Sequence, residues 1–322
     1  MKTTEDHTPP QTAGDAKGLV PVNTDFIKGV IPPIVTIVDE NEKIDEKRMR
    51  RQVDFVIEGG VHGILAFGSN GEFYMLDEDE MERGLGIILD QTKKRVPVYF
   101  GMGAVKTRKC VQLARMAADM GADGVSVLQP MFLKPTDDEL YLHFKTIAGA
   151  VPGTPVLLYN NPGRTGYSLS APLVGRLAND VENIVGIKDS SGDMTLTSEF
   201  LRLTKTKEKD FKVFGGKDTL IYGALAHGAD GAVATMANFC PELVVSIYEK
   251  YVAGDLKGSL EAQFRLNPVR LAMDRASFPV ATKDMAKLLG LDVGEPFRPN
   301  LSSAGDVLEF MKKRMQQGGL LP

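Results

Sequence analysis

Residues 98–128 read VYFGMGAVKTRKCVQLARMAADMGADGVSVL and contain the pattern that repeats along the whole chain. Two short apolar runs, Val98–Phe100 and Gly124–Leu128, flank a stretch with helical spacing at Thr107–Asp123. The runs are apolar throughout rather than alternating, as is typical of parallel strands buried on both faces. The segment therefore predicts a strand, a helix and a second, parallel strand.

The same unit recurs from about residue 30 onward. The predicted strands are Val30–Val38, Gly63–Phe67, Val98–Phe100, Gly124–Leu128, Val156–Tyr159, Ile184–Lys188, Lys212–Phe214 and Gly231–Ala234. An eighth helix is predicted near Pro241–Ala253. Eight such units in a row favour an α/β fold of the closed (β/α)8 type, a TIM barrel, over an open doubly wound sheet, which stays the alternative.

Three parts of the chain follow from this pattern. Residues 1–25 are polar and predict a flexible N-terminal tail, and residues 26–253 hold the barrel. Residues 254–322 contain helical patterns without strands, at Asp255–Met273, Phe278–Leu289 and Ser302–Gln316. We expect this last part to be a C-terminal helical appendage packed on the barrel.

Composition excludes several classes of protein. The net charge of -4 over 322 residues gives no basic field for nucleic acid or an anionic membrane. No apolar stretch is long enough to span a bilayer, and the start of the chain lacks the apolar region of a signal peptide. Two distant cysteines, Cys110 and Cys240, indicate reduced thiols and a cytoplasmic setting. The four histidines have no zinc-binding spacing.

In a (β/α)8 barrel, chemistry belongs at the carboxyl ends of the strands. The sixth predicted strand ends in Lys188, and the barrel interior can desolvate its ammonium, lower its pKa and supply a neutral amine that attacks a carbonyl. The alternative is a lysine that extends to water. The preceding strand ends in Tyr159, which could relay protons or simply pack in the barrel wall.

Two further loops offer groups for a carboxylate substrate. Ser69 and Asn70 lie in a glycine-rich loop after the second strand, where backbone and side-chain donors can form a nest for a small carboxylate. Glu72, in the same loop, could cap or brace it. Arg164 has a planar fork suited to a second carboxylate, although a surface ion pair is the alternative.

Taken together, these loops resemble the N-acetylneuraminate lyase and dihydrodipicolinate synthase family of class I, Schiff-base-forming aldolases. The resemblance covers nearly the whole chain after about residue 28 and rests on three motifs, G-x-x-G-E at 68–72, Y-N-x-P-x-R-T-G at 159–166 and G-I-K-D at 186–189. It implies that Lys188 forms the Schiff base, that Tyr159 relays protons, and that Ser69 and Asn70 bind the carboxylate of pyruvate.

The resemblance also implies further site residues and an assembly. The backbone of Val233 contributes to the site, and the loop of Gly216, Lys217 and Asp218 lines the pocket for a second substrate, whose identity these residues would set together with Arg164 and Ser190. The family implies a homotetramer built from two dimers. Its chemistry needs a small-molecule 2-oxo acid and an aldehyde, with no metal or organic cofactor.

Two positions depart from the dihydrodipicolinate synthases. These usually have Gly-Thr-Thr-Gly-Glu where this chain has Ser69 and Asn70, and they have a tyrosine that crosses a dimer interface where this chain has Phe132. Phe132 has no hydroxyl to relay a proton, and the Ser-Asn form of the loop resembles 4-hydroxy-2-oxoglutarate aldolase and some 2-keto-3-deoxy sugar acid aldolases. The preferred prediction is therefore a lyase that cleaves a 2-keto-3-deoxy sugar acid or 4-hydroxy-2-oxoglutarate to pyruvate and an aldehyde.

Three alternatives remain. Dihydrodipicolinate synthase, which condenses pyruvate with aspartate semialdehyde, is favoured by Arg164, which matches the synthase pattern. A non-catalytic 2-oxo acid sensor would also accommodate Phe132. A phosphate-binding barrel has only weak support, because the glycine-rich segments 101–107 and 215–218 are incomplete phosphate motifs.

Overall fold

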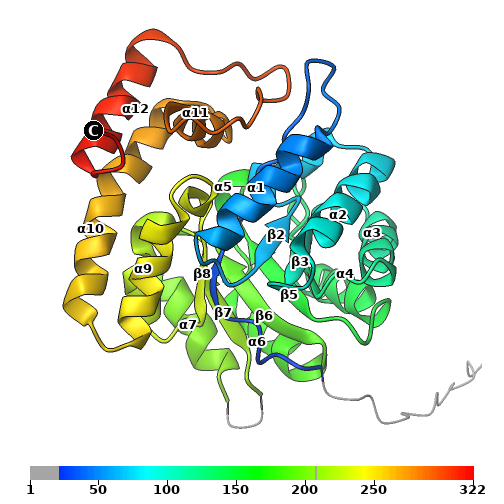
Figure 1. Ribbon diagram of the computed structural model, residues 1–322. Helices are drawn as coiled ribbons and strands as arrows, with labels where there is room; N and C mark the ends of the chain where they lie inside the picture. The colour runs from blue at the N-terminus through cyan, green and yellow to red at the C-terminus, as the bar shows by residue number, and fades with distance from the viewer. Residues whose placement is uncertain (1–21, 207–208) are drawn as a thin grey trace, which may run out of the picture.

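The computed structural model describes residues 22–206 and 209–322, in which eight strands form one parallel sheet. The strands are β1 Gly29–Ile31, β2 Ile64–Ala66, β3 Val98–Met102, β4 Gly124–Leu128, β5 Val156–Asn160, β6 Ile184–Asp189, β7 Lys212–Gly215 and β8 Gly231–Val233. Each strand pairs with its neighbour in the chain from β2 to β8, and β8 pairs with β1. Figure 1 shows the sheet surrounded by helices. The predicted (β/α)8 barrel is confirmed.

Helices connect the strands and continue beyond the last one. Those between strands are α1 Glu46–Glu58, α2 Glu78–Thr92, α3 Thr107–Asp119, α4 Asp137–Gly149, α5 Pro162–Thr165, α6 Ala171–Asp180, α7 Met194–Thr204 and α8 Ile221–Ala226. After β8 come α9 Pro241–Val252, α10 Leu256–Ala272, α11 Val280–Leu288 and α12 Gly305–Gln317. The short 3₁₀ turns are η1 Ser69–Gly71, η2 Phe73–Met75, η3 Asp218–Leu220, η4 Thr235–Asn238 and η5 Met273–Arg275. None of the helices in the described ranges is both long and apolar enough to cross a membrane.

The barrel closes between β1 and β2 through a short seam. Here the backbone N–H of Leu65 donates to the carbonyl of Pro32 at 2.9 Å, and the N–H of Ile34 donates to the carbonyl of Leu65 at 3.0 Å. The first strand was predicted to run from Val30 to Val38, but β1 ends at Ile31. The prediction was wrong there because Pro32 and Pro33 have no N–H to donate to a ladder.

Two apolar clusters lie on the two sides of the sheet. The larger one joins strand residues such as Ile64 and Phe100 to helix residues such as Val53 and Leu85. The smaller one takes one side chain from each of seven strands, which places it inside the barrel; its strand members are Ile31, Leu65, Tyr99, Leu157, Val185, Phe214 and Val233. The interior is therefore a packed core beneath the rim.

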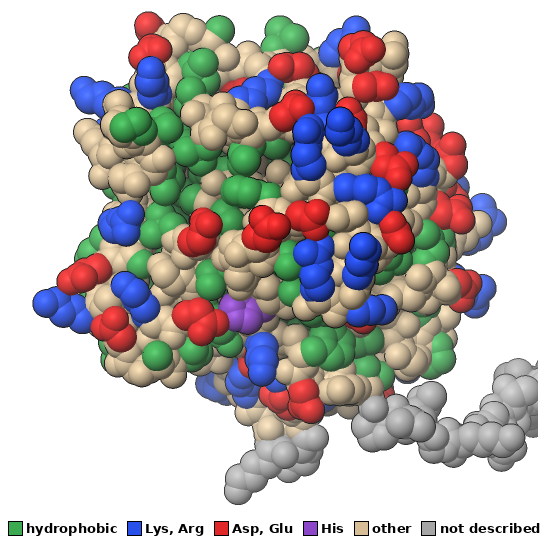
Figure 2. Space-filling model, viewed as in Figure 1, with side chains coloured by type: hydrophobic (Ala, Val, Ile, Leu, Met, Phe, Trp, Pro, Cys, Tyr) green, Lys and Arg blue, Asp and Glu red, His purple; other side chains and the backbone are tan. Residues whose placement is uncertain are grey.

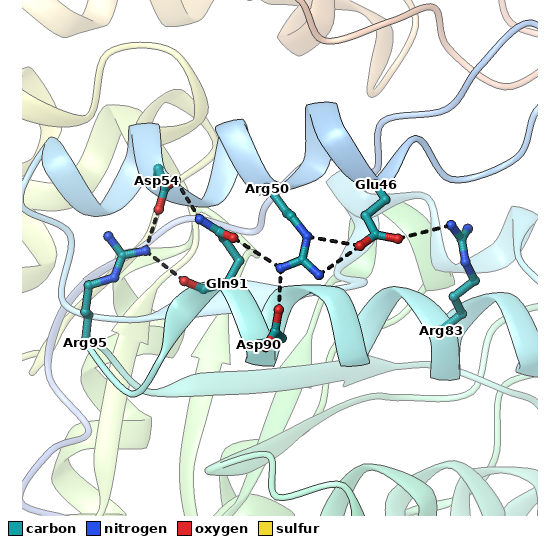
Figure 3. A network of polar contacts seen from close by, with 7 residues as sticks. All are labelled: Glu46, Arg50, Asp54, Arg83, Asp90, Gln91 and Arg95. Carbon is teal, nitrogen blue, oxygen red and sulfur yellow. Dashed lines mark hydrogen bonds and ion pairs between the residues drawn. The ribbon is translucent and has the colours of Figure 1, made fainter.

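Helices α1 and α2 are joined on their outer side by polar contacts. Figure 3 shows Arg50 of α1 between Glu46 of the same helix and Asp90 of α2. Asp54 of α1 accepts hydrogen bonds from Gln91 and from Arg95, which follows α2. Opposite charges alternate along the two helices, so the network creates no field of one sign. On the face in Figure 2, basic and acidic side chains likewise lie interspersed.

The C-terminal helices contact the barrel at several places. Helix α10 packs against α9, and α11 packs against η4 at the rim and lies above the barrel in Figure 1. The last predicted helix, at Ser302–Gln316, begins later, at Gly305, because the backbone of Ala304 is extended, and the N–H of Ser303 donates to Asp284 at 3.0 Å. Residues 1–21 of the predicted tail at 1–25 lie outside the described residues, and the division at 26–253 and 254–322 stays a prediction.

A buried ion pair fixes α11 to the loop after β2. Lys283 Nζ lies 3.1 Å from Glu72 Oε2, and the two side chains are 1% and 0% exposed. Burial raises the pKa of Glu72 and lowers that of Lys283, while each charge opposes the shift of the other. Moving two charges out of water costs free energy, and either charge would be strongly destabilising if its partner were removed.

Loss of the cation from the buried pair of Lys283 and Glu72 should cost more stability than the same loss from an exposed ion pair. Lys283→Met leaves Glu72 buried without a cation and should lower the free energy of unfolding by about 3–5 kcal/mol. Urea denaturation followed by circular dichroism measures the loss. The matched control is Lys43→Met, because Lys43 pairs with Glu80 at 2.8 Å but its side chain is 69% exposed. The control should unfold as the wild type does, and equal midpoints for both variants would contradict the prediction.

Candidate active site

The register between β5 and β6 places Tyr159 directly beside Lys188. The two side chains are 5% and 4% exposed, and Lys188 Nζ lies 4.0 Å from the centre of the Tyr159 ring. Both residues were predicted from the sequence to lie at adjacent strand ends. The structure brings them together at the carboxyl rim of the barrel, where the amine and the phenol can reach the same small molecule.

The hydroxyl of Tyr159 is held in a polar network. Asn161 Nδ2 donates to Tyr159 Oη at 2.7 Å, and Ser69 Oγ lies 3.3 Å from the same oxygen. Burial alone would raise the pKa of Tyr159, but the positive charge of Lys188 and the hydrogen bond with Ser69 outweigh it and lower the pKa below its usual value of 10. The phenol is thus better able to exchange a proton near neutral pH.

Ser69 and Asn70 lie in η1 and are each 4% exposed. The first N–H groups of a helical turn have no acceptor within the turn, and no side chain caps this one at Gly68. The side chain of Asn70 is already engaged, since its Nδ2 donates to Thr235 Oγ1 at 2.9 Å and its Oδ1 accepts from Thr282 Oγ1 at 3.0 Å. The loop is therefore held in place next to the Tyr159 hydroxyl, and, within the described residues, the N–H groups at the start of η1 are its free donors.

The residues that follow Tyr159 and Lys188 form a second pair across the strands. Asn160 Nδ2 donates to Asp189 Oδ1 at 2.8 Å, and Asp189 Oδ2 accepts from Thr197 Oγ1 at 2.6 Å. Asn160 and Asp189 are buried and support the strand ends from outside the site. The sequence analysis assigned them no role, although their places immediately after the two candidate catalytic residues were a usable signal.

Ser190 and Gly216 lie together at the ends of β6 and β7. Ser190 Oγ donates to the carbonyl of Gly216 at 3.3 Å, and the N–H of Gly216 donates to the carbonyl of Asp189 at 2.7 Å. A Cβ atom on Gly216 would lie 2.1 Å from Ser190 Oγ, so only glycine fits there. The neighbouring Lys217 is exposed.

Asp218, which was predicted to line the pocket for a second substrate, is buried. It is 3% exposed, and its two carboxylate oxygens accept the N–H groups of Thr235 and Met236 at 3.1 and 2.7 Å. Burial raises its pKa, opposed by Arg270 and by these N–H groups. Its contacts brace η4 after β8, and its predicted role toward a substrate stays a prediction.

The remaining predicted residues are Val233 and Arg164. Val233 ends β8 and belongs to the interior cluster beneath the rim. Arg164 lies on α5, is exposed, and its Cζ lies 4.2 Å from the ring centre of Phe278, which precedes α11. Phe278 and Thr282 were not found by sequence analysis, because nothing in a C-terminal helical pattern indicates which barrel loop it will contact.

Side chains suited to metal ions do not gather in the described ranges. Within residues 22–206 and 209–322, no group of three or more His, Cys, Asp and Glu side chains is close enough together to hold one. Cys110 and Cys240 are buried and unpaired with each other.

Comparison with known proteins identifies relatives over most of the chain. Residues 26–317 match the Dihydrodipicolinate synthetase family. The 4-hydroxy-tetrahydrodipicolinate synthase of Methanopyrus kandleri is 34% identical over 297 residues, covering 92% of this chain and 98% of that protein. The enzyme of the same name from Thermus thermophilus is 36% identical over 298 residues, with the same two coverages.

Solved structures agree with these relatives. A dihydrodipicolinate synthase from Thermotoga maritima superposes with a TM-score of 0.88 at 31% identity, covering 91% of this chain and 99% of that one. A prophage protein of the same family from E. coli K12, solved in complex with pyruvate, gives a TM-score of 0.87 at 29% identity, with the same coverages. The predicted family is thus confirmed: the chain belongs to the dihydrodipicolinate synthetase family, whose members are pyruvate-dependent lyases and synthases.

Proposed function

We propose that this protein forms a Schiff base between Lys188 and a 2-oxo acid and makes or breaks a carbon–carbon bond next to the imine. The observation that carries the proposal is the amine of Lys188, buried at the rim and 4.0 Å from the Tyr159 ring. Pyruvate bound to the E. coli relative supports a 2-oxo acid as the ligand. In this proposal the predicted alternative of a lysine that extends to water is set aside, because Lys188 is 4% exposed.

The chemistry follows from the positions of the two side chains. The neutral amine attacks the C2 carbonyl of the 2-oxo acid, and loss of water from the carbinolamine leaves a protonated imine that accepts electrons. In cleavage, the C4 hydroxyl loses its proton to Tyr159 or to the substrate carboxylate, the C3–C4 bond breaks, and an aldehyde leaves. The remaining enamine takes a proton at C3, and hydrolysis of the imine releases pyruvate and restores Lys188.

The other loops supply the proposed contacts for carboxylates. Ser69 and Asn70 would hold the carboxylate of the 2-oxo acid, beside Tyr159. Arg164 would meet a carboxylate on the second substrate, since its side chain is exposed and its Cζ lies 4.2 Å from the centre of the Phe278 ring. The pocket for that substrate would also include Ser190, Gly216, Lys217 and Asp218, with the backbone of Val233 on its far side.

The second substrate distinguishes two functions. The preferred one is cleavage of a 2-keto-3-deoxy sugar acid or 4-hydroxy-2-oxoglutarate, since the hydroxyl of Tyr159 is contacted by Ser69 and Asn161, and Phe132 has no hydroxyl to extend a relay. The second candidate is 4-hydroxy-tetrahydrodipicolinate synthase, the name carried by the bacterial and archaeal relatives. A 2-oxo acid sensor would bind pyruvate without turnover.

We also propose that the protein acts as a homotetramer in the cytoplasm, made of two dimers. The support for an assembly is the loop between β4 and α4, where Phe132 is 99% and Leu133 is 43% exposed. Neighbouring apolar side chains this exposed favour a contact with another protein surface. A second copy of the chain would cover them.

The Schiff base has a direct test. Incubation with pyruvate and borohydride should add a reduced three-carbon adduct to Lys188, which peptide mass spectrometry locates. Lys188→Ala should give no adduct and no turnover while its circular dichroism spectrum stays that of the wild type. An adduct elsewhere, or none at all, would refute the proposed function.

Tyr159→Phe tests the proton relay. The variant keeps the ring beside Lys188 but removes the hydroxyl, so kcat should fall by about 10²–10⁴, as expected for one positioned acid–base group. Borohydride trapping of pyruvate at long times should still label Lys188. A turnover rate equal to that of the wild type would remove Tyr159 from the mechanism.

A substrate panel separates the candidate functions. We expect pyruvate release, measured with a coupled dehydrogenase, from at least one 2-keto-3-deoxy acid or from 4-hydroxy-2-oxoglutarate. The condensation of pyruvate with aspartate semialdehyde is measured beside it. Higher kcat/KM for the condensation would identify the synthase instead, and labelling of Lys188 without any turnover would identify the sensor.

A further inference from the structure

Helix α11, in the C-terminal part of the chain, makes two buried contacts with the loop Ser69–Glu72. Thr282 Oγ1 donates to Asn70 Oδ1 at 3.0 Å, across 212 positions of sequence. The next residue, Lys283, pairs with Glu72 at 3.1 Å. Thr282 and Lys283 are each 1% exposed, so water does not compete for either contact.

The two contacts restrain the loop on both sides of Gly71, at Asn70 and at Glu72. Asn70 is held on its other side by Thr235, to which its amide donates at 2.9 Å. Lys283 is itself fixed by donating to the carbonyl of Glu295 at 2.9 Å. The backbone turns sharply at Glu72, whose φ of 51° lies in the left-handed region. Such a turn needs support from its surroundings, and α11 provides part of it.

The barrel holds the middle of the loop independently. Thr36 Oγ1 donates to the carbonyl of Gly71 at 2.6 Å. A Cβ atom on Gly71 would lie 2.9 Å from the carbonyl oxygen of Ile34. Loss of a contact from α11 would therefore loosen the Asn70 and Glu72 ends of the loop while its centre stays in place.

We propose that Thr282 and Lys283 are positioning residues that set the affinity for the carboxylate of the 2-oxo acid. The proposal rests on the proposed function, and it gives α11 a part in binding the 2-oxo acid. Thr282 acts through Asn70, and Lys283 acts through Glu72. Neither contacts Lys188 or Tyr159 by a hydrogen bond or ion pair within the described residues, so the bond-making steps are left to those two.

The test uses Thr282→Val, which removes the hydroxyl and keeps the shape of the side chain. The initial rate of borohydride trapping on Lys188 is measured by mass spectrometry against pyruvate concentration. The half-saturating concentration should rise about 3- to 10-fold, the net worth of one hydrogen bond, and the rate at saturation should stay within about 2-fold. Thr282→Ser keeps the hydroxyl and should restore the wild-type value.

Thr92→Val is the matched control for a buried threonine. Thr92 is 1% exposed on α2, and its Oγ1 has no hydrogen-bond partner in the described residues. The same chemical change should therefore leave the half-saturating concentration as it is in the wild type. A purely structural part for Thr282 would change the unfolding midpoint and not the half-saturating concentration of the folded protein.

The double variant Glu72→Gln with Lys283→Met tests the second contact without leaving one buried charge alone. It should also raise the half-saturating concentration of pyruvate, by at least about 3-fold on the scale of one lost polar contact. Values within 2-fold of the wild type for Thr282→Val or for the double variant overturn the part of the proposal that each one tests. Absence of trapping in the wild type is a different result, because it refutes the Schiff base itself.

Discussion

The parallel pairing of β5 with β6 is the constraint on which the site depends. It sets Tyr159 beside Lys188 and Asn160 beside Asp189, so one register defines both the pair proposed to react and the hydrogen-bonded pair next to it. Side chains alternate between the two faces of a strand, and a slip by one residue would turn Lys188 out of the barrel. Apolar packing on both sides of the sheet prevents such a slip, because the slip would turn the side chains of the interior cluster toward the helices.

Several charged side chains at the rim of the barrel are buried away from water. Each has a defined set of partners: Lys283 for Glu72, and two backbone N–H groups for Asp218. Lys188 differs from these, since it is buried against the Tyr159 ring and no carboxylate pairs with it in the described part of the chain. The other charges are satisfied by neighbouring groups of the protein, whereas Lys188 would find its partner in the 2-oxo acid of the proposed function.

The sequence allowed the strands, and the places of Tyr159 and Lys188 at adjacent strand ends, to be predicted because both are local. A continuous apolar run marks a buried strand, and its last residue marks the rim, which was enough to find Lys188 and Tyr159. The end of β1 was predicted wrongly because an apolar run was followed through Pro32 and Pro33, although neither has an N–H for the ladder. Thr282 was out of reach, since its contact with Asn70 spans 212 positions and has no local signature.

The attachment of α11 to the loop after β2 bears on how the protein is made. During synthesis the N-terminal part of a chain can begin to fold first. The strands that carry Tyr159 and Lys188 leave the ribosome well before Thr282 and Lys283 do. The loop around Asn70 lacks its last supports until the C-terminal helices have arrived. A nascent chain would thus have made both strand ends before the contacts from Thr282 and Lys283 to the Asn70 loop can form, so this corner of the rim would be completed only as translation ends.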